Sequence, residues 1–145
     1  MFITQISVYL ENARGTLREM TKLLAENEID ITALSIADTT NFGIVRLVLR
    51  EDSIDKAINC MKNAGFMVKK TNVICVCVPN KPGALDNILA VIEDTDISIE
   101  YIYSFNYGVD GDALFVLRPS DSERVIELFK ENNIRMYSQE EINSL

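Results

Sequence analysis

The segment ICVCVPNKPGAL (residues 74–85) joins an apolar run to an apolar-periodic run through a turn that contains Pro82 and Gly83. Pro82 fixes φ near the helical value and lacks the N–H group that the first turn of a helix leaves unpaired, while Gly83 permits close approach of backbone or ligand. The segment therefore predicts a strand that turns directly into a helix. The amide groups at the start of that helix either form a plain turn or bind a carboxylate or phosphate.

A second copy of this segment lies earlier in the chain. A shift of 68 residues without a gap places ISVYLENARGTL (residues 6–17) over residues 74–85. In the same register Gly43 falls on Gly111 and Val48 falls on Val116. Agreement at turn glycines and apolar positions in one constant register indicates an internal repeat, and it predicts two domains over residues 1–70 and 71–145.

Both repeats show the same order of strand and helix patterns. In the first repeat we expect a helix after Gly15, another that begins near Ser53, and strands over residues 3–10, 29–37, 44–50 and 66–69. In the second we expect helices over residues 84–93 and 122–132, and strands over residues 73–78, 99–105, 113–118 and 134–138. The order β-α-β-β-α-β predicts an α+β fold of two ferredoxin-like domains, each with an antiparallel four-stranded sheet and both helices on one face. The uncovered sheet face and edge favour side-by-side packing of the two domains, and association of two chains as a homodimer.

Charge and hydropathy exclude two classes of partner. The formal net charge is -8 and no cluster of Lys and Arg offsets it, so we expect no nucleic-acid partner. No apolar run approaches the roughly 20 residues that cross a bilayer, and the N-terminus lacks a basic segment followed by an apolar one. We therefore expect a cytoplasmic protein without a membrane partner.

The chain contains no histidine, which removes the commonest general base and the commonest zinc ligand. Catalysis by Ser/His or Cys/His pairs is thereby excluded, whereas carboxylate-only or lysine chemistry stays open, although the acidic residues are scattered along expected helix faces and ends. Cys60, Cys75 and Cys77 form no C-x-x-C motif, and the last two alternate on one face of an expected strand. We expect structural cysteines, no catalytic residue, no metal and no cofactor.

The turn pattern N-x-P-G-x-L, followed by an I-x-I pair at the expected second strand, resembles the ACT domain, a small amino-acid-binding regulatory module. The resemblance covers nearly the whole chain. It implies side-by-side association of ACT domains and a free amino acid bound at a domain interface, near the first turn and the second strand. The ligand-binding residues that it implies are Leu10, Glu11, Asn12, Ala13, Arg14, Gly15, Thr16, Leu17, Ile29 and Ile31 in the first repeat, and Asn80, Lys81, Pro82, Gly83, Ala84, Leu85, Ile97, Ser98 and Ile99 in the second.

The first repeat departs from this pattern at two positions. Arg14 stands where the second repeat has Pro82, and it is either a solvated surface residue or a partner for a ligand carboxylate. Thr16 stands where the second repeat has Ala84, and its hydroxyl either caps the helix or donates to the ligand. The sequence leaves open whether one turn or both bind ligand.

Three functions follow from these observations. The resemblance favours a stand-alone regulatory protein that senses a free amino acid and acts in trans on an enzyme or transporter of amino-acid metabolism. The alternative is a structural or assembly subunit that keeps the ACT fold for protein contacts and binds no ligand. An acylphosphatase-like enzyme would share the strand order, but it needs an arginine-asparagine phosphate site, for which one turn with Arg14 is thin support. We therefore expect that the protein is not an enzyme.

Overall fold

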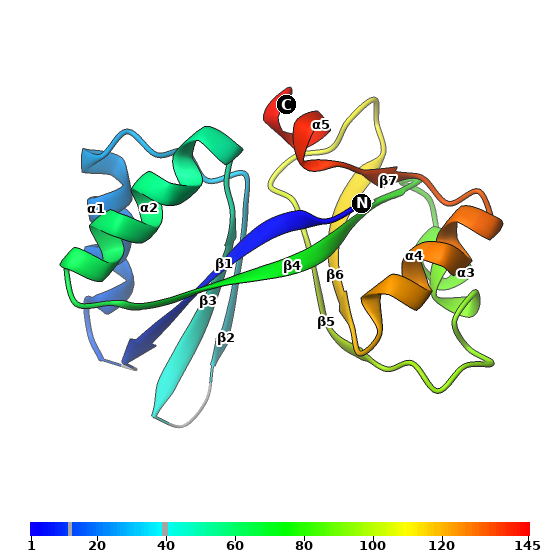
Figure 1. The fold of residues 1–145 in the computed structure, drawn as a ribbon, viewed down its shortest axis with the longest axis horizontal. Helices are drawn as coiled ribbons and strands as arrows, with labels where there is room; N and C mark the ends of the chain where they lie inside the picture. The colour runs from blue at the N-terminus through cyan, green and yellow to red at the C-terminus, as the bar shows by residue number, and fades with distance from the viewer. Residues whose placement is uncertain (12, 39–40) are drawn as a thin grey trace. The chain divides into compact units, whose positions relative to one another are not determined.

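The computed structural model describes residues 1–11, 13–38 and 41–145. The chain forms two compact units. We call Thr4–Asn72 the N-terminal unit, and we call Val73–Leu145 together with Met1–Ile3 the C-terminal unit. Figure 1 shows the elements of each unit along the chain.

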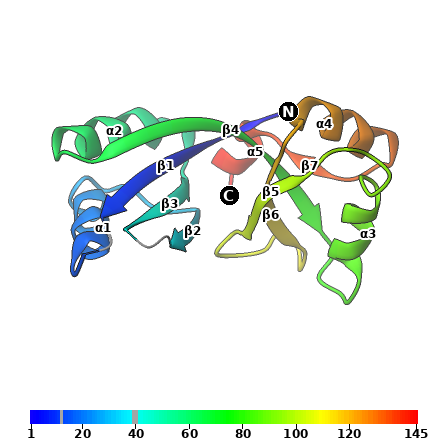
Figure 2. The same cartoon turned by 90° about the horizontal axis from the view of Figure 1, so that it is seen from below.

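The N-terminal unit is a split β-α-β arrangement. Its elements are β1 (Ile3–Glu11), α1 (Thr16–Glu26), β2 (Ala33–Asp38), β3 (Phe42–Val48), α2 (Glu51–Asn63) and the first part of β4 (Met67–Val78). The strand order is β2-β3-β1-β4, and β3 pairs antiparallel with both β1 and β2. Both helices cover the same face of this sheet (Figures 1 and 2).

The core of the N-terminal unit lies between the two helices and the sheet. Alternate residues of β1 point to this side, because successive side chains of a strand face opposite ways. Met20 and Leu24 are one helical turn apart on α1, so they face the sheet together. The buried cluster comprises Ile6, Val8, Leu10, Met20, Leu24, Ile29, Val45, Leu47, Leu49, Ile54, Ala57 and Met61.

The C-terminal unit repeats the arrangement. Its elements are the second part of β4, α3 (Ala84–Ala90), β5 (Ile99–Ser104), β6 (Ala113–Pro119), α4 (Ser122–Glu131), β7 (Met136–Tyr137) and α5 (Gln139–Asn143). The strand order is β7-β4-β6-β5, with antiparallel pairing throughout. The buried cluster beneath its helices comprises Ile74, Val76, Val78, Ala84, Ile88, Ile92, Leu117, Val125, Ile126, Phe129 and Met136. The expected fold class, two α+β ferredoxin-like units with antiparallel sheets, is confirmed.

The strands expected over residues 66–69 and 73–78 are one strand in the structure. β4 continues through Lys70, Thr71 and Asn72 without a break. No Gly or Pro interrupts this stretch, so nothing in the local backbone ends the strand between the two repeats. The boundary between the two compact units therefore falls inside β4.

The expected constant register is wrong at the second hairpin. In the N-terminal unit, Ser7 of β1 pairs with Arg46 of β3. In the C-terminal unit, Cys75 of β4 pairs with Val116 of β6. Cys75 lies 68 residues after Ser7, but Val116 lies 70 residues after Arg46. The hairpin before β6 is thus two residues longer than its counterpart before β3. Val48 and Val116 therefore do not occupy equivalent positions, although they align in the sequence.

The end of the chain also differs from expectation. The last strand, expected over residues 134–138, is reduced to the two residues of β7, and the helix α5 follows it. Ser138 starts α5 with a capping box: its hydroxyl accepts from the Glu141 amide, and the Glu141 carboxylate accepts from the Ser138 amide. This reciprocal cap turns the strand into a helix.

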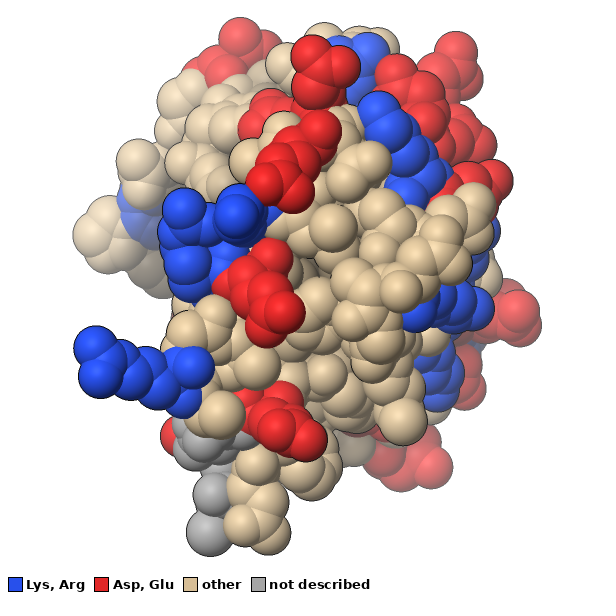
Figure 3. Space-filling view, turned by 90° about the vertical axis from the view of Figure 1, so that its left-hand side faces the viewer, with Lys and Arg blue, Asp and Glu red and all other residues tan. Residues whose placement is uncertain are grey.

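The face that carries α1 and α2 is drawn in Figure 3, where acidic and basic side chains are interspersed. Lys22 pairs with Glu26 at 3.6 Å, and Lys70 pairs with Asp55 at 2.9 Å. The Lys and Arg side chains coloured in this view do not form a continuous basic surface. In the part of the chain that the structure describes, no helix is long and apolar enough to cross a membrane.

Candidate functional site

The turn between β1 and α1 is organised by Gly15 and Thr16. Gly15 occupies the N-cap position of α1 with φ +88°, a left-handed conformation that glycine adopts without a steric penalty. The Thr16 hydroxyl donates to the carbonyl oxygens of Glu11 at 2.9 Å and Ala13 at 2.5 Å. The hydroxyl therefore holds the backbone of the turn, and α1 has no side-chain cap.

A pocket of about 570 Å³ lies beside this turn, within the N-terminal unit. It opens between the start of α1 and the adjoining ends of β1, β2 and β3. The residues that line it are Leu10, Glu11, Ala13, Gly15, Thr16, Leu17, Arg18, Ile36, Asp38, Gly43 and Val45.

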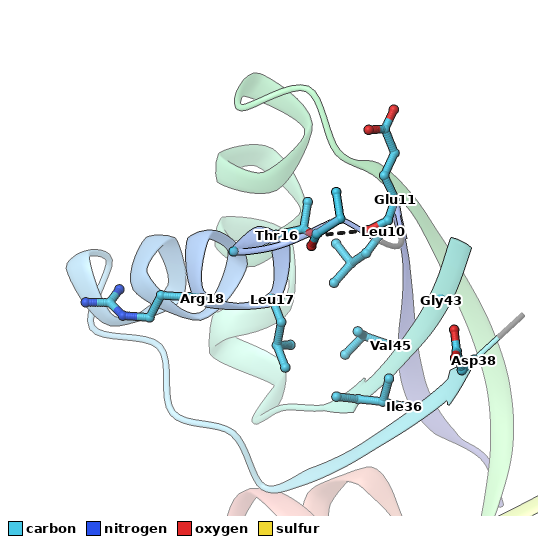
Figure 4. Close-up of a pocket in the computed structure, with 11 residues that line it drawn as sticks. Leu10, Glu11, Thr16, Leu17, Arg18, Ile36, Asp38, Gly43 and Val45 are labelled. Atoms are coloured by element: carbon cyan, nitrogen blue, oxygen red, sulfur yellow. Dashed lines mark hydrogen bonds between the residues drawn. The ribbon is translucent and has the colours of Figure 1, made fainter. Parts of the chain in front are cut away.

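The inner surface of the pocket is apolar. Figure 4 shows the side chains of Leu10, Leu17, Ile36 and Val45 converging on one space. Leu10 and Val45 belong to the buried core, but Leu17 and Ile36 are 40% and 47% exposed. The pocket is thus an open end of the hydrophobic core, where the described residues cover two large apolar side chains only in part.

The polar groups of the pocket lie at its rim. The carboxylates of Glu11 and Asp38 and the guanidinium of Arg18 belong to lining residues, and Figure 4 shows Glu11 and Arg18 pointing away from the apolar side chains. The first-turn amides of Leu17 and Arg18 have no acceptor four residues earlier within α1. Among the described residues no side chain caps α1, so a carboxylate can accept from these donors.

The structure brings six of the residues implied for the first repeat to this pocket: Leu10, Glu11, Ala13, Gly15, Thr16 and Leu17. Asn12 lies outside the described residues. Arg14 is exposed at the turn and does not line the pocket.

The expected Ile29/Ile31 pair is wrong as an opening of the second strand, because β2 begins at Ala33. The Ile29 amide instead donates to the Leu24 carbonyl at 3.0 Å, which closes the end of α1. Ile29 is buried in the core and Ile31 packs against it. Both side chains stabilise the unit and neither lines the pocket.

The turn of the second repeat has the same backbone but different surroundings. Gly83 starts α3 with φ +83°, and Lys81, Pro82 and Gly83 are exposed. Ala84 is buried and Leu85 packs against the core of the C-terminal unit. Asn80 lines a different pocket, of about 560 Å³, which is formed mainly by the hairpin residues 104–108 and 111–115.

The second I-x-I pair is also separated from the turn. Ile97 and Ile99 line a hollow of about 430 Å³ beside α3, and Ile97 lies before β5, which begins at Ile99. The Ser98 amide donates to the Ser120 hydroxyl at 3.1 Å. The structure does not bring the residues implied for the second repeat into one pocket.

Five lining residues were missed by sequence reasoning: Arg18, Ile36, Asp38, Gly43 and Val45. Four of them follow from strand pairing, because Ile36 lies opposite Val45 and Asp38 lies opposite Gly43. Alternation along the expected second strand would have placed Ile36 and Asp38 on one face. The register that sets them against β3 depends on the hairpin and is not visible in the pattern of either strand alone.

The three cysteines are free and their pKa values are raised. Burial raises the pKa of the Cys75 thiol far above its ordinary value. Burial also raises the pKa of Cys77, and nearby Asp112 acts in the same direction. Among the described residues, no group of three Asp, Glu or Cys side chains is placed to hold a metal ion.

Comparison with known proteins gives the family. The family described as the ACT domain pair matches residues 1–145. The structure is similar to that of protein BT0572 from Bacteroides thetaiotaomicron, with 35% identity, a TM-score of 0.89, and coverage of 100% of this chain and 98% of that one. A search of curated proteins finds no match.

Two more distant structures share the fold. The regulatory subunit of aspartate kinase from Thermus thermophilus, in a ligand-free form, is 13% identical with a TM-score of 0.61, and covers 88% of this chain and 90% of that one. The corresponding subunit from Thermus flavus is 14% identical with a TM-score of 0.59 and the same coverage. Because the family match spans both units and their β-α-β-β-α-β order agrees with it, the chain belongs to the ACT domain pair family.

Proposed function

We propose that this ACT domain pair is a regulatory protein that binds a free amino acid in the pocket beside Gly15. It then acts on a separate enzyme or transporter of amino-acid metabolism. The observation that carries the proposal is the pocket itself, in which the first-turn amides of α1 adjoin apolar side chains that are partly exposed.

The two ends of an amino acid suit the two parts of the pocket. The ligand carboxylate can accept from the amides of Leu17 and Arg18, where the positive end of the α1 dipole favours an anion. The ammonium group needs acceptors, and the rim supplies the carboxylate of Asp38. The ligand side chain is left to face Leu17 and Ile36.

Action in trans is supported by the organisation of the chain. The ACT domain pair accounts for residues 1–145, so these residues hold no separate catalytic domain. The similar Thermus thermophilus protein is a regulatory subunit, and this chain covers 90% of it. A regulatory role on a partner enzyme agrees with both facts.

We further propose that two chains associate as a homodimer. β2 forms an edge of the sheet in the N-terminal unit and β5 forms an edge in the C-terminal unit. An edge strand carries unpaired backbone groups that another strand can complete. Light scattering at tens of micromolar that gives only the chain mass of 16.3 kDa would contradict this association.

The proposed ligand binding is tested with the twenty amino acids, each at millimolar concentration, in a thermal-shift assay followed by calorimetric titration. At least one amino acid should raise the melting temperature, since a ligand that binds only the folded state stabilises it. If none raises the melting temperature and none gives a binding isotherm, the sensing function is refuted. A structural or assembly role of the ACT fold would then take its place.

A further inference from the structure

The two units offer an internal comparison at the pocket. In the N-terminal unit, Val45 of β3 pairs with Val8 on one side and Ile36 on the other. In the C-terminal unit, Phe115 of β6 pairs in the same way with Val76 and Ser104. Phe115 therefore takes the position of Val45, although it does not align with Val45 in the gap-free register of the sequence.

The space beside these positions differs between the two units: the C-terminal unit has a pocket of about 560 Å³ lined by Phe115 and Ser104, but residues 81–85 of the Gly83 turn do not line it. Phe115 and Leu85 pack against the core of the C-terminal unit. Their counterparts in the N-terminal unit are Val45, which is smaller, and Leu17, which is 40% exposed in the pocket. Where the C-terminal unit places a partly buried aromatic ring, the N-terminal unit has the smaller Val45 and a vacancy that is lined by apolar groups and reaches the Gly15 turn.

We propose that this vacancy selects an amino acid with a large apolar side chain, and that the N-terminal unit alone binds it. The inference rests on the proposed function and adds the class of ligand and the number of sites. The ligand side chain would cover Leu17 and Ile36 and extend the core, as Phe115 packs against the core of the C-terminal unit.

The chemistry of the lining excludes polar side chains from this position. Leu10, Leu17, Ile36 and Val45 provide no hydrogen-bond partner through their side chains, so a polar or charged group placed among them would lose its contacts with water without replacement. A small side chain such as that of alanine would leave most of the apolar surface uncovered. Phenylalanine, leucine and isoleucine satisfy both requirements.

The test is calorimetric titration of the full chain with phenylalanine, leucine and isoleucine, compared with alanine, serine, aspartate and lysine. At least one of the first three should bind about tenfold or more tightly than any of the other four, with one ligand per chain. Tightest binding of a polar amino acid would overturn the inference and leave the proposed function intact. Failure of every amino acid to bind would overturn both, and two ligands per chain would overturn the single site.

Variants based on the internal comparison test the location. Val45→Phe copies the C-terminal unit and should reduce affinity about tenfold or more, because the introduced ring occupies the pocket. Phe115→Val is the matched control and should leave affinity unchanged.

Because Val45 is buried, its replacement can disturb folding. Ile36→Ser, which introduces the residue at position 104, therefore provides a second test at a side chain that is 47% exposed. It should reduce affinity for the apolar ligand while the melting temperature of the free protein changes little. Parental affinity in a folded Ile36→Ser variant, or equal losses in Val45→Phe and Phe115→Val, would overturn the inference.

Discussion

Replacing Gly15 and Gly83 in turn by alanine separates the conformational role of the turn from its role in binding. The two glycines have φ values of +88° and +83°, and no atom of the described residues beyond the neighbouring backbone lies within 4 Å of a Cβ added at either position. The cost of alanine is therefore backbone strain without a clash. Left-handed backbone costs a residue with a side chain about 1–2 kcal/mol, and the reduced freedom of the unfolded chain returns part of this. We expect each variant to lose about 1 kcal/mol of unfolding free energy.

The assay is urea unfolding of the two alanine variants and of Gly15→Asn and Gly83→Asn. Asparagine tolerates positive φ better than alanine, so the asparagine variants should lose less stability. The same proteins are then titrated with the amino acid that gives the largest thermal shift. Gly15→Ala should weaken binding because Gly15 lines the pocket, whereas Gly83→Ala should bind like the parent. The reasoning is refuted if neither alanine variant is destabilised, or if both lose the same affinity.

Three further changes test the packing and the charges that the structure shows. Phe129→Ala removes a fully buried ring and should cost about 3–5 kcal/mol in urea unfolding, so a loss below 1 kcal/mol would contradict its place in the core. Ser138→Ala removes the hydroxyl of the α5 capping box and should cost about 1 kcal/mol by the same measurement, whereas Ser144→Ala, which removes one exposed hydrogen bond to the Glu140 carbonyl, should cost less. The raised pKa of Cys75 predicts that stability is constant below the pKa of the unfolded thiol, about 8.5, and falls as pH rises above it, because only the unfolded thiol ionises there. Unfolding at pH 7 and pH 10 should show a smaller alkaline loss for Cys75→Val than for the parent.

Much of the fold was predictable because local signals agreed with each other. The turn glycines, the strand alternation and the helix faces all repeat, and the sheet-and-helix order follows from them. The prediction failed where the signal was not local. The hairpin before β6 has two extra residues, which shift β6 by two positions relative to β3 in the alignment of the repeats. Because side chains alternate along a strand with a period of two, the same positions stay apolar and the sequence pattern does not reveal the shift.

The candidate site shows the same limit. Gly15, Thr16 and Leu17 could be placed at a ligand-facing turn, since they belong to one short segment. Ile36 and Val45 enter the pocket only through the pairing of β2 with β3. The resemblance implies Ile29 and Ile31 at the site, but the C-terminal end of α1 directs them into the core.

The continuous strand β4 has a consequence for the history of the chain. Met67–Asn72 of this strand belong to one unit and Val73–Val78 to the other, while Met1–Ile3 belong to the C-terminal unit, in which Phe2 packs against the core. A break between residues 70 and 71 would sever β4 and remove Phe2 from the fragment that needs it. The C-terminal half therefore does not hold all of its own core: a fragment of residues 71–145, released by a protease or passed to another gene, would lack Phe2.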